Sequence, residues 1–227
     1  MRDTKDAMAM EVMTFVRMLG RGGVDATITL ESGRTGTPLW WAARGMPSSD
    51  YDDEGELVDE EAEAETEMVE SRLALAQLLV EKGADVNAIG KDGDVNPSTP
   101  LWWAARAVCV GREGGLALAQ LLVEKSADVN TVGEDTDGNP SIPLWWAARA
   151  VYHGREVGLV LAKLLVEKGA DVNAVGKYEN GNPSTPLWLA AQAANAGKEV
   201  GTALVRLLNP RWEGQPLPLT PPFGETP

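Results

Sequence analysis

The 227-residue sequence contains one cysteine, Cys109, and one histidine, His153. A single cysteine cannot form an internal disulfide, and one cysteine with one histidine cannot supply the usual ligand set of a zinc site. These absences exclude a disulfide scaffold and most zinc centres. We therefore expect a fold that is held together by packing, with no cofactor and no metal.

Long apolar runs and positive charge are scarce as well. No stretch approaches the roughly 18 apolar residues of a membrane span, and Asp3, Asp6 and Glu11 stand where a signal peptide needs an apolar centre. We expect a soluble cytoplasmic protein. With 20 Lys and Arg against 34 Asp and Glu, the net charge is −14, which repels nucleic acid. A hydrophobic fraction of 44% still allows a sizeable core.

A repeat of 43 residues dominates what the sequence does contain. Residues 73–87 and 116–130 are identical, except that Gly83 becomes Ser126. The run Pro-Leu-Trp-Trp-Ala-Ala-Arg also recurs, and its copies begin at Pro38, Pro100, Pro143 and, in a looser form, Pro186. A fixed period of this length is typical of repeat architectures.

Each unit has two apolar runs with helical spacing, separated by a turn such as Gly111 to Gly115. Thr99 and Pro100 suit the N-cap and first position of the first helix. Gly83 or Gly169 suits the left-handed residue that ends the second helix. The pattern predicts a helix-turn-helix unit.

Two motifs in register with these helices resemble the ankyrin repeat. The family's Thr-Pro-Leu-His-x-Ala-Ala motif is similar to residues 37–43, 99–105, 142–148 and 185–191, and its Gly-Ala-Asp-Val-Asn-Ala motif matches 83–88 and 169–174. The resemblance extends from about Met8 to Asn209. It implies an all-α, ankyrin-type solenoid with a half-repeat as N-terminal cap. It also implies a non-enzymatic module that binds a protein partner.

The sequence departs from the family in repeat length and in one motif residue. The usual period is about 33 residues, so each unit has about ten more, which we place around Cys109–Gly115 and Gly133–Pro140. The family's histidine is replaced by tryptophan, which predicts that its polar link to the turn is missing. The replacing residues are Trp40, Trp102, Trp145 and Trp188.

The motif positions divide the chain into six parts. Between Asp50 and Ser71 the first repeat carries twelve acidic residues and no basic one. We expect residues 59–72 to extend a helix and the acids to select a basic partner. We also expect the Pro-rich tail to fold back through Trp212 or Phe223. The parts are a capping half-repeat and loop (1–36), repeat 1 (37–98, with the acidic insertion 47–70), repeat 2 (99–141), repeat 3 (142–184), a capping repeat (185–210) and the tail (211–227).

Other motifs give weak support for chemistry. Cys109 and His153 occupy nearly equivalent places in successive units, which favours tolerated substitutions over a nucleophile and its base. The run Asp135–Asn139 resembles a calcium loop, but Pro140 stands where that loop needs glycine. Acid pairs such as Glu60 and Glu61 lack an apolar enclosure that would separate their pKa values. An enzyme is therefore not expected.

The tryptophans and arginines of the first helices are the most informative feature. At spacing i and i+4, Trp102 and Arg106 share a helix face, which allows cation–π contact. Two interpretations remain open. Tryptophan could fill the gap between units, or the second tryptophan of each pair could be exposed with its arginine on the concave surface, since both types are enriched in binding hot spots.

The sequence thus predicts a monomeric interaction module or scaffold that binds a protein of unknown identity. The alternative is a structural subunit or small-molecule binder, in which the tryptophans hold a permanent neighbour or an apolar ligand. The predicted contact residues lie on the first helices and the loops before them. They are Trp41, Arg44, Trp103, Arg106, Trp146, Arg149, Leu189, Gln192, Asp92, Asp94, Asp135, Asp137, Tyr178 and Glu179.

Overall fold

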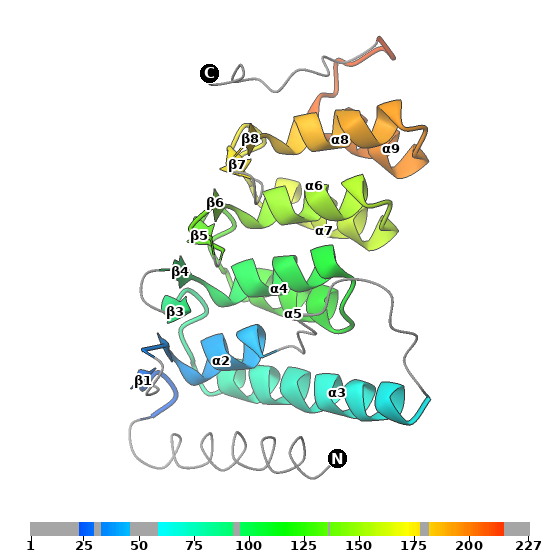
Figure 1. Cartoon of the computed structure of the whole chain (residues 1–227). Helices are drawn as coiled ribbons and strands as arrows, with labels where there is room; N and C mark the ends of the chain where they lie inside the picture. Colours follow the sequence, from blue (N-terminus) through cyan, green and yellow to red (C-terminus); the bar gives the residue numbers. More distant parts are fainter. Residues whose placement is uncertain are drawn as a thin grey trace.

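The fold is a stack of helix-turn-helix units in two rows of helices (Figure 1). The computed structural model describes residues 23–29, 33–45, 59–92, 96–135, 137–177 and 182–215, and within the long helix α3 it describes side chains from Val69 onward. Successive first helices pack on one another, as do successive second helices. The predicted helical repeat solenoid is therefore confirmed.

A proline at the first helical position begins every first helix, where its missing N–H leaves no hydrogen bond unmade. The hydroxyl oxygens of Thr37, Thr99 and Thr185 each cap one of these helices by accepting a backbone N–H three residues ahead, at 3.3, 3.3 and 3.2 Å. At Ile142 no hydroxyl is present, and proline alone marks the start. The first helices are α2 (Pro38–Arg44), α4 (Pro100–Val110), α6 (Pro143–Tyr152) and α8 (Pro186–Asn195).

The second helices form the other row. The longest of them begins at Asp59, so the predicted helical extension of the acidic insertion is confirmed, whereas residues 46–58 lie outside the described residues. Acidic residues at a helix N-terminus complement the helix dipole. The second helices are α3 (Asp59–Glu81), α5 (Gly115–Glu124), α7 (Glu156–Glu167) and α9 (Glu199–Leu208).

Short antiparallel strands precede each first helix, where the sequence predicted only loops. They pair as hairpins, for example Gly90 with Ser98 and Gly133 with Ser141, and the first two hairpins join into a four-stranded sheet. Figure 1 shows them at one end of the helices. The strands are β1 (Ile28–Thr29), β2 (Thr35–Gly36), β3 (Gly90–Asp92), β4 (Asn96–Ser98), β5 (Gly133–Glu134), β6 (Pro140–Ser141), β7 (Gly176–Lys177) and β8 (Pro183–Ser184).

The core runs through the whole stack, because the same repeat positions face inward in each unit. Leu101 and Leu144 of the first helices are fully buried, as are Leu118, Leu161 and Leu204 of the second helices. Full burial of a leucine side chain contributes about 1.5–3 kcal/mol. Since each unit packs mainly on its neighbours, stability is a sum of units and interfaces.

Polar side chains also link successive units at the turns after the second helices. The backbone N–H of Asp128 donates to Asn87 Oδ1, and that of Asp171 donates to Asn130 Oδ1, both at 2.7 Å. The N–H of Asp85 donates to Asp25 Oδ1 at 2.8 Å. These bonds fix the register between neighbouring units in addition to the apolar packing.

The tail begins as predicted, with Trp212 packed against the core. Its indole N–H donates to the carbonyl oxygen of Gln215 at 2.8 Å, and the guanidinium of Arg206 lies 6.0 Å from its ring centroid. Phe223 and the predicted capping helix at residues 7–19 lie outside the described residues.

Candidate functional site

The four first helices bring one position of each repeat into a row along the stack. Because every copy starts at its proline, Arg44, Arg106 and Arg149 occupy the same place in α2, α4 and α6. Each of these arginines is half-buried. We call them the arginine row.

The first tryptophan of each pair is a core residue that ties one unit to the next. Trp40, Trp102 and Trp145 are at most 1% exposed. The indole N–H of Trp102 donates to Ser141 Oγ at 3.0 Å, and that of Trp145 donates to Ser184 Oγ at 2.9 Å. The tryptophan that replaces the family's histidine thus makes a polar link of its own, because its larger side chain reaches the serine that immediately precedes the next motif copy.

Glycine makes room for each of these rings. A Cβ atom at Gly133 would lie 2.6 Å from Cδ1 of Trp102, and one at Gly176 would lie 2.5 Å from Cδ1 of Trp145. Both distances are well below van der Waals contact. The glycine in the hairpin and the tryptophan in the helix therefore belong to one structural unit.

Of the two interpretations left open, exposure of the second tryptophan does not hold for two of the three pairs. Trp103 is 8% exposed and Trp146 is 3% exposed, whereas Trp41 is half-buried. Trp103 packs edge-on against Trp102 of its own unit and Trp40 of the preceding one, with ring centroids 5.0 and 6.0 Å apart. The edge-on stacking of flat rings across the unit interface accounts for the burial.

The arginine row lies against these buried rings. The guanidinium carbon of Arg106 lies 5.4 Å from the ring centroid of Trp103 and 5.9 Å from that of Trp146 in the next unit. Arg44 bridges Trp41 and Trp103 in the same way, at 5.8 and 5.5 Å. Cation–π contacts of this kind contribute about 0.5–2 kcal/mol and hold the side chain in one orientation. Arginine thus alternates with tryptophan along the stack.

The formal charges on the four first helices are all positive. The four first helices contain Arg44, Arg106 and Arg149 and no acidic residue. Among the described residues, the buried indole N–H groups of Trp41, Trp103 and Trp146 meet no hydrogen-bond acceptor. Guanidinium and indole groups are donors only, so the face offers donors and positive charge.

The capping repeat departs from this pattern. Leu189 occupies the place of Trp146 and is fully buried, while Gln192 occupies the place of Arg149 and is half-buried. The prediction of Leu189 as a surface contact was wrong, because the position is buried here as it is at Trp103 and Trp146. Gln192 stays a candidate without the charge.

The predicted loop residues fall on the hairpins. Asp92 ends β3, where it pairs with Asn96. The carboxylate of Asp135 accepts the backbone N–H groups of Asp137 and Asn139 at 3.0 and 2.8 Å, which uses it to close the turn. Asp94, Tyr178 and Glu179 lie outside the described residues.

Sequence reasoning missed an apolar row on the same hairpins. Ile89, Val132 and Val175 immediately precede β3, β5 and β7 and are 61%, 54% and 39% exposed. Their spacing of one repeat was a visible signal. The glycine that follows each of them faces the buried tryptophan, so the preceding side chain points to solvent by strand alternation.

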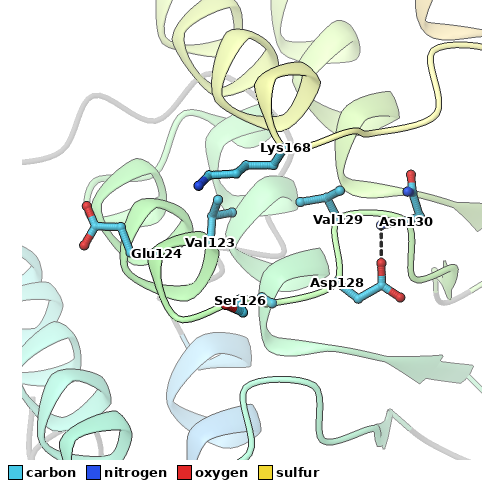
Figure 2. Close-up of a pocket in the computed structure, with 8 residues that line it drawn as sticks. Val123, Glu124, Ser126, Asp128, Val129, Asn130 and Lys168 are labelled. Atoms are coloured by element: carbon cyan, nitrogen blue, oxygen red, sulfur yellow. Dashed lines mark hydrogen bonds between the residues drawn. The ribbon is translucent and has the colours of Figure 1, made fainter.

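A second candidate is a hollow of about 340 Å³ beside the turn after α5 (Figure 2). Its lining includes Glu124, Ser126, Asp128 and Lys168, all of them exposed. Figure 2 shows the Lys168 side chain extending across Val123 from the next unit. Catalytic groups are activated by enclosure and desolvation, which these exposed charges lack.

The only cysteine and the only histidine of the sequence lie in different surroundings. Cys109 is buried in α4, whereas His153 is exposed at the end of α6. Within the described ranges, no three His, Cys, Asp or Glu side chains are grouped closely enough to hold a metal ion. None of the helices described in this chain combines the length and apolarity needed to cross a bilayer.

Comparison with known proteins agrees with the geometry. The family model described as Ankyrin repeat matches residues 98–134 and 141–177, and each range comprises a first helix, a second helix and the strand that follows them. No curated protein matches the chain. Ankyrin repeats commonly mediate protein–protein interaction and are generally non-enzymatic.

Proposed function

Since the chain is an ankyrin repeat protein, we propose that it is a non-enzymatic scaffold that binds a protein partner on the face of its first helices. The observation that carries the proposal is the arginine row. Three half-buried guanidiniums are held against tryptophan rings at one per unit. Arginine is enriched in binding hot spots, and a pre-ordered side chain loses less entropy on binding.

The burial of the tryptophans limits the proposed contact residues of the first helices to the arginines. Trp103 and Trp146 support the arginines from beneath and stabilise the stack, so they are not themselves contact surface. For the same reason we disfavour the alternative in which the tryptophans hold an apolar ligand. The exposed row Ile89, Val132 and Val175 is a further part of the proposed surface, because apolar contacts beside arginine are typical of interfaces.

The test is quantitative affinity capture from a native lysate, in which three forms of the chain are compared by mass spectrometry. The first is the wild type, and the second carries Arg44→Gln, Arg106→Gln and Arg149→Gln. The third carries Lys82→Gln, Lys125→Gln and Lys168→Gln. The control removes the same charge at the same repeat spacing from exposed positions after the second helices.

We expect proteins captured by the wild type and by the lysine variant to be lost from the arginine variant. Equal capture by all three forms would contradict docking on the arginine row. A fourth form, in which the five acids between residues 50 and 56 are replaced by amides, tests whether the acidic insertion selects a basic partner. If the acidic insertion selects the partner, capture should fall in the amide variant and in no other form.

A further inference from the structure

We propose that the arginine row recognises an extended acidic segment of the partner, with one carboxylate per repeat unit. The inference rests on the proposed function, because it names the chemistry of the partner that docks on the first helices. Its basis is the charge, the donor inventory and the spacing of the described residues.

The first step is charge complementarity. The first helices carry three guanidiniums and no acid, although the chain as a whole has a net charge of −14. Guanidinium binds carboxylate through two parallel N–H···O bonds, which makes the pair selective for this acceptor. A basic segment would meet like charge along the whole row.

The second step concerns the indole groups beneath the arginines. In the described part of the chain, the buried Nε1 atoms of Trp103 and Trp146 have no acceptor, and a buried unpaired donor is destabilising. The face therefore favours an acceptor-rich partner over an apolar one.

The third step is the distance between successive arginines. Arg44 and Arg106 lie 5.5 and 5.4 Å from the same Trp103 ring centroid, so their guanidinium carbons are at most roughly 11 Å apart. Stacked helices are separated by about 8–10 Å. A polyproline II segment advances about 9.3 Å in three residues and returns to the same face. Carboxylates at every third residue of such a segment match the row.

Long-range repulsion by the acidic chain does not prevent this contact. At physiological ionic strength the Debye length is about 8 Å, so charges beyond that distance are largely screened. Ion pairs that form in contact with the arginine row are screened much less.

The test is fluorescence anisotropy with two labelled nine-residue peptides of glutamate, proline and alanine, titrated with the intact chain at physiological salt. One peptide carries glutamate at its first, fourth and seventh positions, and the other has the same composition with its three glutamates adjacent. We expect the spaced peptide to bind, and to bind more tightly than the adjacent one. Equal affinity for the two peptides would mean that binding is unspecific charge attraction, and it would overturn the proposal.

The same titration with the two triple variants locates the site. Loss of a charged hydrogen bond weakens binding about tenfold or more, so the triple arginine variant should bind the spaced peptide at least a hundredfold more weakly. The triple lysine variant should bind it as the wild type does. Circular dichroism checks that the triple arginine variant is folded. If it is not, the titration is repeated with variants in which a single arginine is replaced by lysine, which keeps the charge.

Failure of this inference can be told apart from failure of the proposed function. If neither peptide binds, while proteins captured from a lysate still depend on the arginine row, the docking face stands and the acidic extended segment is wrong. If capture is also independent of the arginines, both proposals fail.

Discussion

At the scale of single residues, the feature that distinguishes this chain is the substitution of tryptophan for the histidine of the ankyrin motif. The indole ring is accommodated by a hairpin glycine, and its N–H donates to the serine that immediately precedes the next motif copy. Three residue types at three separate motif positions therefore depend on one another.

This dependence predicts unequal effects of two equivalent mutations. In Ser141→Ala, the buried N–H of Trp102 loses its acceptor Oγ, which should lower the free energy of unfolding by about 1–3 kcal/mol. In Ser98→Ala, Trp40 keeps the backbone carbonyl of residue 98 as acceptor at 2.9 Å, so the loss should be smaller. Urea denaturation measures both. Equal losses would show that the serine hydroxyls act only by filling space.

At the scale of elements, the helices were predictable because their signals are local. Proline at the first position, threonine before it and a 43-residue period place each first helix without reference to the rest of the fold. The hairpins were not predictable, since strands of two or three residues containing Gly and Pro run against strand propensity. Pairing between β2 and β3 joins the first two hairpins, whereas the other two hairpins each form a sheet of their own.

The residue that ends the second helices is glycine in some repeats and serine in another, which allows a direct comparison. Gly83 and Gly169 adopt φ of 88° and 86° after α3 and α7, whereas Ser126 adopts φ of 67° after α5. The left-handed conformation costs a residue with a Cβ atom roughly 1–2 kcal/mol.

We therefore expect Ser126→Gly to raise the free energy of unfolding by about 1 kcal/mol and Gly169→Ser to lower it by a similar amount. Thermal and urea unfolding measure both changes. No gain from Ser126→Gly would mean that the serine side chain makes a compensating interaction at this turn.

At the scale of the whole molecule, the sequence predicts the candidate face but not the division of roles within it. The i, i+4 spacing places Trp102 and Arg106 on one face, and the repeat aligns the arginines. Which tryptophan is buried depends on the distance between units, and no single unit contains that information. The stacked rings bury Trp103 and Trp146 and leave the arginines at the surface.

Tryptophan fluorescence with acrylamide quenching tests this division of roles most directly. Replacing the half-buried Trp41, Trp188 and Trp212 by phenylalanine leaves five tryptophans, all of them buried. We predict blue-shifted emission that acrylamide quenches weakly, since the rings are packed between units. Red-shifted emission that is readily quenched would place the tryptophans at the surface and contradict an interface in which arginine binds and tryptophan supports.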